Sequence, residues 1–238
     1  MKSTIHANPL AQASDVDGWQ MEGEGKVTFA NGRMRLEGTR DPGPDTDRAA
    51  NQLANLVYWC PEEFPDNIVI SWDFWPVAEP GLCIIFFAAR GRKGEDLFDP
   101  ALAPRTGPYT QYHSGDINAL HVSYFRRRYP SADRNFCTCN LRKSRGFHMV
   151  AQGADPIPCV RDAQGPYHME LLKAGPRVRF SINTLPILDW TDDASTFGPV
   201  LTSGKIGIRQ MTPMVAEYAN FKVRVAEESN HAAREQTD

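Results

Sequence analysis

Short alternations of apolar and polar residues run along most of this chain, and helical periodicity is scarce. A period of two places alternate side chains on opposite faces of a strand, so that one face can be buried. Residues 25–38 predict a hairpin around Asn31-Gly32, because Asn-Gly favours the two-residue turns of hairpins. Further strands are predicted at 67–77, 81–90, 108–113, 119–127, 135–143, 147–153, 167–175, 177–190, 204–211 and 216–225. Residues 47–59 leave a short helix and the entry to a strand equally open.

Many short strands without alternating helices predict an all-β fold, namely a two-sheet antiparallel β-sandwich. No internal repeat, low-complexity block or Pro/Gly-rich linker divides the chain. We therefore expect residues 1–225 to form a single domain. Residues 226–238 are polar and are expected to form a frayed C-terminal tail.

Composition narrows the range of partners. The net charge of −3 and the pI near 6.1 argue against a general nucleic-acid binder, which would be strongly basic. No apolar run suits a signal peptide or a membrane span, so we expect a cytoplasmic protein with no membrane partner. Five cysteines without zinc-like spacing are interpreted as small buried hydrophobic residues in a reducing compartment.

Residues 107–130 concentrate titratable side chains on two of the predicted strands. Alternation groups three residues on one face of each strand: Tyr109, Gln111 and His113 on the first, and His121, Ser123 and Arg127 on the second. Only alternate members of the run 126–128 can point the same way, so we expect Arg127 toward a ligand and Arg126 and Arg128 paired or solvated.

Two other predicted strands carry the same kind of polar face. Asn140 and Arg142 alternate with Cys139 and Leu141, and Asp73 and Trp75 alternate with apolar residues on 67–77. Side chains rich in Arg, His, Tyr and Asn on the non-core face indicate a curved sheet that lines a groove. The alternative is an outer sheet with unusual but idle polar residues.

Five segments of the chain resemble a bacterial domain family of unknown function. They are "NPLAQASDVDGWQMEGEGKVTFANGRMRLE", "WDFWPVAEPGLCIIFFAARGRKGEDLFDP", "YTQYHSGDINALHVSYFRR", "CNLRKSRGFHMVAQGADPIP" and "GKIGIRQMTPMVAEYANFKV". The resemblance implies the concanavalin A-like lectin/glucanase jelly roll, with two packed sheets of which one is concave. It also implies a place near genes for the use of pectin, rhamnogalacturonan and other acidic plant polysaccharides. It assigns no catalytic residue, because lectins, hydrolases and lyases share this fold.

Hydrolysis of a glycoside requires two carboxylates across the scissile bond. The E-x-D-x-x-E strand of jelly-roll glucanases is absent. The nearest acidic cluster, Glu95, Asp96 and Asp99, is a weak candidate for a structural, calcium-like ion with oxygen ligands, and a solvated loop or cap is the favoured alternative. No cofactor is required by the sequence.

Eliminative cleavage of a uronate needs a group that neutralises the substrate carboxylate, and a Tyr or His that removes the neighbouring proton. We predict His113, Tyr109, Gln111 and His121 as catalytic residues. We predict Arg127, Ser123, Asn140, Arg142, Asp73 and Trp75 as substrate-binding residues. Gln111-Tyr112-His113 also resembles the Gln-x-His strand of jelly-roll alginate lyases, in which Gln and His approach the substrate carboxylate.

The sequence thus favours a carbohydrate-active protein whose partner is an acidic oligosaccharide of plant or bacterial origin, cleaved as by a lyase. Three alternatives stay open: hydrolysis in the same groove, non-catalytic lectin-like binding, and isomerase- or epimerase-like handling of a sugar. The sugar, the oligomeric state and any metal requirement are left open too.

Overall fold

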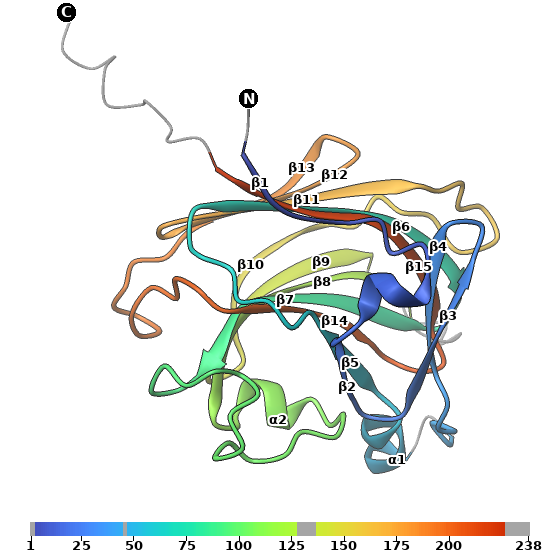
Figure 1. Ribbon diagram of the computed structural model, residues 1–238, viewed down its shortest axis with the longest axis horizontal. Helices are drawn as coiled ribbons and strands as arrows, with labels where there is room; N and C mark the ends of the chain where they lie inside the picture. The colour runs from blue at the N-terminus through green and yellow to red at the C-terminus, as the bar shows by residue number, and fades with distance from the viewer. Residues whose placement is uncertain (1–2, 45–46, 128–136, 227–238) are drawn as a thin grey trace, which may run out of the picture.

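Two antiparallel sheets lie one upon the other in the computed structural model, which describes residues 3–44, 47–127 and 137–226 (Figure 1). The eight-stranded sheet has the order β13-β12-β11-β6-β15-β4-β3, and β1 also pairs with β15. Its strands are β1 (Thr4–Asn8), β3 (Gly25–Ala30), β4 (Arg33–Gly38), β6 (Ile68–Ala78), β11 (Tyr167–Ala174), β12 (Arg177–Ile182), β13 (Leu185–Thr191) and β15 (Val215–Val225). The predicted all-β sandwich is confirmed.

The seven-stranded sheet has the order β10-β9-β8-β7-β14-β5-β2. Its strands are β2 (Gln20–Glu22), β5 (Leu56–Trp59), β7 (Gly81–Gly91), β8 (Ile117–Arg127), β9 (Thr138–Ser144), β10 (His148–Ala154) and β14 (Lys205–Gln210). Two short helices, α1 (Arg48–Leu53) and α2 (Thr110–His113), and a 3-10 turn over Ala13–Val16 complete the described elements. The sequence missed β1 and β2, which carry few apolar residues.

Alternation along the strands builds the core between the sheets. On β12, Val178, Phe180 and Ile182 are buried while the residues between them face outward. Aromatic rings from both sheets meet in this core, as where Trp72 lies 5.8 Å from Tyr124 between ring centroids. Each large side chain buried in this way contributes about 1.5–3 kcal/mol through the hydrophobic effect.

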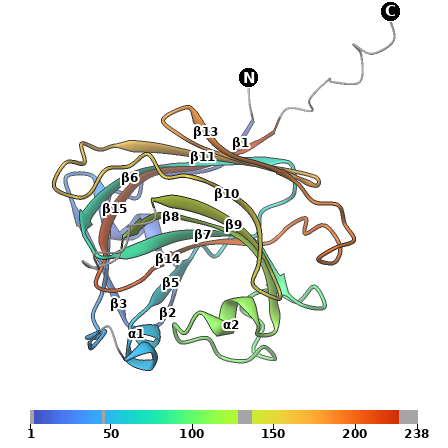
Figure 2. The same cartoon turned by 180° about the vertical axis from the view of Figure 1, so that it is seen from behind.

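The seven-stranded sheet is covered on both faces. Its outer face carries a second apolar cluster that includes Trp59, Ile84 and Phe86, and Tyr112 of α2 packs into it. Figures 1 and 2 show α2 on the side of this sheet that faces away from the other sheet. The outer face of the seven-stranded sheet, where the groove was predicted, is therefore partly covered by the segment that contains α2.

Residues 108–113 are a helical turn rather than the predicted strand. The amides of Gln111, Tyr112 and Ser114 donate to carbonyls three or four residues earlier. Pro108 suits the start of such a turn, because its ring holds φ near the helical value. The turn also inserts the fully buried ring of Tyr112 against Phe86, a tertiary contact that local alternation cannot foresee.

Turn residues explain two other boundaries. Asn31 and Gly32 both have positive φ, as the predicted hairpin turn requires. The predicted strand 177–190 is instead two strands, because Asn183 and Thr184 both take positive φ and reverse the chain.

Residues 47–59, which the sequence left open, contain both structures in turn. The Asp47 side chain accepts from the amides of Ala49 and Ala50 and begins α1, and β5 follows.

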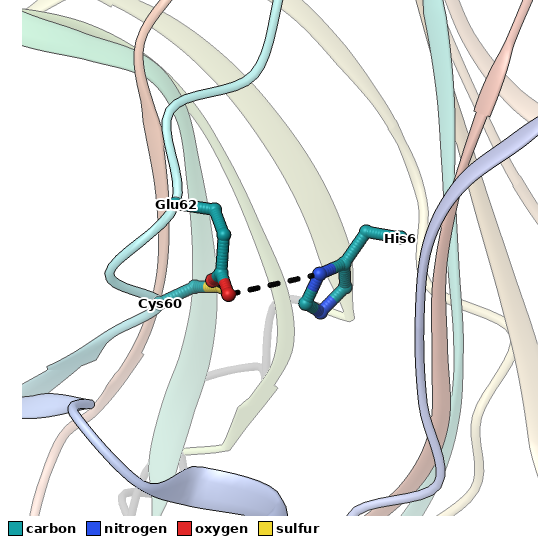
Figure 3. A group of neighbouring side chains, drawn as sticks. All are labelled: His6, Cys60 and Glu62. Carbon is teal, nitrogen blue, oxygen red and sulfur yellow. Dashed lines mark hydrogen bonds and ion pairs between the residues drawn. The ribbon is translucent and has the colours of Figure 1, made fainter.

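The N-terminal strand connects the two sheets at one edge. β1 pairs with β15 of the eight-stranded sheet, and its His6 lies beside Cys60 and Glu62, which follow β5 of the other sheet (Figure 3). All five cysteines are free. Cys60, Cys83 and Cys139 are buried as predicted, whereas Cys137 is exposed and Cys159 is partly exposed. The reducing compartment stays a prediction.

The extent of the domain also stays a prediction. The expected frayed tail falls largely on residues 227–238, outside the described part, although Ala226 is buried. Within the described ranges, no helix has the length and hydropathy needed to cross a bilayer.

Candidate functional site

Polar side chains gather on the outer face of the seven-stranded sheet where β8 pairs with β9. The register sets His121 opposite Arg142 and Ser123 opposite Asn140. The structure thus brings four of the predicted site residues together, because both strands alternate with the same phase. Their roles in binding and catalysis stay predictions.

Tyr109 and His121 form the closest polar pair of this face. The Tyr109 hydroxyl lies 2.6 Å from Nε2 of His121, whose side chain is fully buried against Phe86. Burial lowers the pKa of His121 well below 6.5, and the charges of Arg142, His113 and Arg209 lower it further. The imidazole is therefore neutral at neutral pH.

The same burial raises the pKa of Tyr109 to about 12, while Arg209, Arg142 and Arg126 act in the opposite direction. We assign the phenol as the donor to Nε2 of His121, because this tautomer gives the hydroxyl proton a partner. The proton of the neutral ring then sits on Nδ1, which has no hydrogen-bond partner among the described residues. A buried donor without a partner is a position that a ligand or a water can fill.

His113 reaches the same site by a helical repeat. Four residues after Tyr109, its ring lies 4.9 Å from the tyrosine ring and 4.4 Å from that of Phe147. Arg142 stacks 3.8 Å above Phe147, which is 41% exposed, so this edge of the site opens to solvent. Burial lowers the pKa of His113, and Arg142 and Arg209 add to the effect. Tyr109 and His113 thus lie side by side as predicted, but because a helical turn brings them together and not because a strand alternates.

Gln111 does not join this group. On a helical turn, residue 111 points away from 109 and 113. Its Oε1 accepts from the amide of Thr106 at 2.7 Å and so holds the loop before α2. The likeness to a Gln-x-His strand therefore fails, because the segment is not a strand.

Arg127 faces the wrong way for the predicted contact with a ligand. β8 bulges where Phe125 takes a positive φ, and its register with β7 shifts at this point. Arg127 consequently turns into the sandwich, where it binds Asp155 at 3.1 Å and the carbonyl of Ile157. Arg127 and Asp155 form an ion pair, and both side chains are buried.

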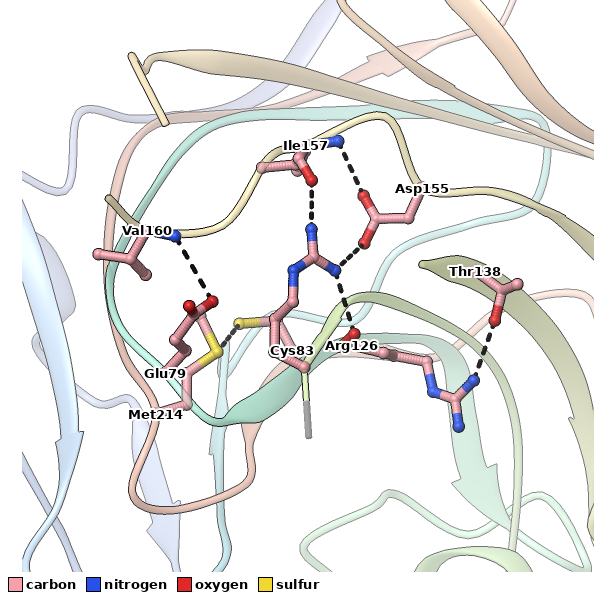
Figure 4. Close-up of polar contacts among 9 residues, drawn as sticks. Glu79, Cys83, Arg126, Thr138, Asp155, Ile157, Val160 and Met214 are labelled. Atoms are coloured by element: carbon pink, nitrogen blue, oxygen red, sulfur yellow. Dashed lines mark hydrogen bonds and ion pairs between the residues drawn. The ribbon is translucent and has the colours of Figure 1, made fainter. Parts of the chain in front are cut away.

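Arg126 takes the outer position instead. Its Nη1 donates to Oγ1 of Thr138 on β9 at 3.0 Å, and its charge acts on Tyr109 (Figure 4). Because of the β-bulge, Arg126 rather than Arg127 lies on the outer face, and Arg127 forms an ion pair with a carboxylate of the chain. Arg128 lies outside the described residues.

Asp73 and Trp75 lie on the outer face of the other sheet. Asp73 accepts from Asn220 at 2.7 Å and contacts His168 at 2.9 Å, and Arg33 stacks 4.0 Å above Trp75. The core of the sandwich separates them from Tyr109. Their predicted place in one groove with His121 is wrong, because alternation along a strand does not tell which sheet the strand joins.

Arg209 on β14 is the residue that sequence reasoning missed. It is fully buried, between β5 and β7, and its guanidinium lies 5.0 Å from the ring of Tyr109. Only Nη1 has a partner in the described structure, the carbonyl of Gly107 at 2.7 Å, whereas Nε and Nη2 have none. Burial lowers the pKa of Arg209. An arginine between the apolar residues of "GKIGIRQM" was the available signal.

Gln210, the next residue on β14, faces the core. It accepts from the hydroxyl of Tyr218 at 2.9 Å and donates to the carbonyls of Leu36 and Met214. This leaves Arg209 as the polar residue of β14 on the outer face next to α2.

Among the described residues, few carboxylates lie near Tyr109 and His121. The charge of Glu22 reaches Arg209, but Glu22 is bound to Arg105 at 2.7 Å. Among the described residues, Tyr109 contacts His113, His121 and Arg209, and its backbone amide donates to Oε1 of Gln52. Two opposed acids are not among these contacts. The arrangement can bind an anion and move a proton through Tyr109 and His121.

The carboxylates of the acidic loop accept from backbone amides, and the suggested calcium-like site stays a prediction. Glu95 and Asp96 accept from the backbone amides of Lys93 and Phe98, and Asp99 does the same for Ala101. Asp96 also pairs with Lys205 at 3.0 Å. These carboxylates cap turns, which is the alternative that the sequence favoured.

Comparison with known proteins places this geometry in a family. A family model described as "Domain of unknown function (DUF1961)" matches residues 3–223. The uncharacterized protein YesU of Bacillus subtilis (strain 168) is 56% identical over 222 residues, which are 93% of this chain and 96% of that protein. A crystal structure of a Bacillus subtilis protein of unknown function with a galectin-like fold superposes with a TM-score of 0.87 and 53% identity, over 95% of this chain and 99% of that one.

More distant structures share the architecture alone. The crystal structure of a native glycosidic hydrolase has a TM-score of 0.58 at 12% identity, over 94% of this chain and 96% of its own. The predicted family of unknown function and its jelly-roll fold are confirmed. The expected neighbourhood of pectin genes stays a prediction.

Proposed function

This chain belongs to the DUF1961 family, and we propose that it acts on acidic, uronate-containing oligosaccharides of plant or bacterial origin by elimination. One observation carries the proposal: the hydrogen-bonded pair of Tyr109 and His121 sits within the electrostatic reach of three arginines, namely Arg126, Arg142 and Arg209. A galectin-like relative and a fold neighbour that is a glycosidic hydrolase support a carbohydrate ligand, but a fold does not choose the reaction.

Recognition of the uronate falls to the arginines. A guanidinium binds a carboxylate with two parallel hydrogen bonds, and the half-buried Arg142 lies at the edge of the site that opens to solvent. Arg209 has Nε and Nη2 without partners in the described structure, but it is fully buried, so a ligand reaches it directly only if the segment with α2 moves. Neutralising the carboxylate stabilises the carbanion-like charge that develops when the adjacent C5 proton leaves. The missing opposed acids are a reason to prefer elimination to hydrolysis.

Proton transfer falls to the pair. The Tyr109 oxygen removes the C5 proton of the uronate as its own phenolic proton passes to Nε2 of His121, so that a free tyrosinate is not formed. The negative charge of the bound uronate offsets the arginine charges that lower the pKa of His121. The C5–H electrons form the C4=C5 double bond, and the bond from C4 to the leaving oxygen breaks. The phenol returns its proton to that oxygen, and His121 ends neutral as the phenol is restored.

The test is incubation with uronate oligosaccharides while the ultraviolet absorbance of the conjugated C4=C5 bond and the reducing ends are both followed. We expect both signals to rise together, and Tyr109→Phe to lower the rate by about 10²–10⁴-fold, the usual contribution of a general acid–base. Binding of the oligosaccharide by Tyr109→Phe, measured by calorimetry, should stay within about tenfold, because the arginines are intact.

The matched control is Asp73→Asn on the outer face of the other sheet, which should keep the full rate. Reducing ends without absorbance would indicate hydrolysis, and binding without any turnover would indicate a lectin-like protein. Either result contradicts elimination.

A further inference from the structure

Three metal-ligating side chains meet at the edge of the sandwich, away from the residues of the Tyr109–His121 site. His6 comes from β1, whereas Cys60 and Glu62 directly follow β5. One ligand atom of each lies within 4.8 Å of the other two (Figure 3). Among the described residues, no other group of three His, Cys, Asp or Glu side chains lies close enough together to hold a metal ion.

His6 lacks the hydrogen bonds expected of a buried imidazole. Its side chain is 15% exposed, Nδ1 lies 3.9 Å from Glu62, and Nε2 is buried without a partner in the described structure. Phe64 and Phe221 contact the ring edge-on, each 5.5 Å away between centroids. The apolar contacts fix the ring and leave its nitrogens unsatisfied, which is uncommon for a buried polar group.

Cys60 and Glu62 complete the group. The fully buried thiol of Cys60 donates to Glu62 Oε2 at 2.7 Å, and Glu62 is half exposed. The carboxylate therefore offers an ion a path from solvent to the thiol and the imidazole.

We propose that His6, Cys60 and Glu62 bind one divalent transition-metal ion of the zinc type. Nitrogen, sulfur and carboxylate oxygen are the ligands of Zn²⁺, at about 2.0–2.3 Å, whereas Ca²⁺ and Mg²⁺ require oxygen ligands. Atoms already within 4.8 Å of one another can be reached from a single ion with small side-chain movements. Three protein ligands leave the fourth tetrahedral position to water.

The local charge suits a dication. The ion replaces the thiol proton of Cys60, so a thiolate and the Glu62 carboxylate together balance its two charges. Lys205 is the cation whose charge reaches Cys60, and it is itself held by Asp96 at 3.0 Å and by the carbonyl of Pro61 at 2.7 Å. Lys205 is thus partly neutralised and does not exclude a metal.

The ion would act as a clamp between the sheets. β1 is hydrogen-bonded to β15 of the eight-stranded sheet, and Cys60 extends β5 of the seven-stranded sheet. Anything that binds only the folded state stabilises it by mass action. Zinc at about 100 times its Kd should raise the Tm by roughly 5–10 °C.

The test uses the full chain without a histidine tag, in a Cys137→Ser/Cys159→Ser background that removes the two thiols that are not buried. Titration with Co²⁺ should give a thiolate-to-cobalt charge-transfer band that saturates at one ion per chain and that Zn²⁺ abolishes. The band should vanish in Cys60→Ser, and His6→Ala should weaken Zn²⁺ binding by at least about tenfold.

Glu62→Gln serves if the buried variants fail to fold, because Glu62 is half exposed; it should weaken binding at unchanged Tm without metal. Absence of the charge-transfer band and of any Tm shift with Zn²⁺ would overturn the proposal. An equal Tm shift with Ca²⁺ would overturn it as well, since a thiolate and an imidazole discriminate against calcium. None of these readouts depends on oligosaccharide turnover.

Discussion

Both sheets carry ion pairs, such as Glu22 with Arg105 on the seven-stranded sheet, but the two differ in how one buried arginine is bound. On the eight-stranded sheet, charged side chains meet charges of opposite sign, as in Arg33 with Glu217 at 3.2 Å and Arg224 with Glu170 at 2.7 Å. On the seven-stranded sheet, Arg209 is buried, and the carbonyl of Gly107 is its one hydrogen-bond partner among the described residues. These arginines of the eight-stranded sheet have carboxylate partners within the chain, whereas Arg209 has none among the described residues, as the proposed binding of an anionic ligand requires.

Two buried arginines show this difference most sharply. Arg127 lies inside the sandwich against the buried Asp155, and Arg209 lies outside it against two tyrosine rings. Burial of a charge is costly unless the charge is paired. Arg127 is therefore expected to serve stability, and Arg209 to serve ligand binding at some cost in stability.

The largest effect is expected from Arg127→Met. It leaves the carboxylate of Asp155 buried without its cation, which should lower the free energy of unfolding by about 3–5 kcal/mol. Urea denaturation measures this change. Arg127→Met/Asp155→Asn should recover part of the loss, and no loss in the single variant would contradict the pairing.

Arg209→Met should instead lower the affinity for the ligand and leave the free energy of unfolding nearly unchanged. Affinity for a uronate oligosaccharide should fall about 10–100-fold, the value of hydrogen bonds to a charged group. The free energy of unfolding should stay within about 1 kcal/mol of the unsubstituted protein, because the side chain had one neutral partner. Calorimetry and urea denaturation together decide the matter. Should Arg209→Met be as destabilising as Arg127→Met, the distinction between the two arginines would be lost.

The free energy of unfolding should fall at acidic pH because His121 is buried in its neutral form. Its pKa in the folded state lies well below the 6.5 of the unfolded chain, so the unfolded chain binds the proton first as the pH falls. The contribution is absent above pH 6.5 and grows below it, by up to about 1.4 kcal/mol per pH unit. Urea denaturation at neutral and acidic pH should show a shallower decline for His121→Gln, and an identical decline would contradict a buried neutral imidazole.

The smallest effect is expected on the other sheet. Glu170→Gln breaks the contact with Arg224 on a partly exposed face, where ion pairs contribute about 0–1 kcal/mol. The free energy of unfolding and the affinity for oligosaccharide should therefore both remain close to those of the unsubstituted protein. A large loss of affinity would move the binding site to the eight-stranded sheet.

Much of the fold and part of the candidate site could be predicted from local alternation. The strand that contains Val178 is buried with a period of two, as predicted. The strands that contain His121 and Asn140 are buried on almost every residue, because the seven-stranded sheet is covered on both faces. The period fails at Phe125, where one extra residue in a bulge turns Arg127 inward, and at Gln111, where the chain is helical. Both departures depend on contacts with distant segments, such as Asp155 and Phe86.

The sequence by itself determined the class of fold, because alternating side chains can bury one face only if two sheets pack together. It also determined that imidazole, phenol and guanidinium groups would outnumber carboxylates in the segment around Tyr109. Only the tertiary structure decided which of these groups meet. Strand order, a bulge and one inserted helical turn join Tyr109, His121 and Arg209 from three separate segments, and the charges left unpaired there are a property of the assembled sheet.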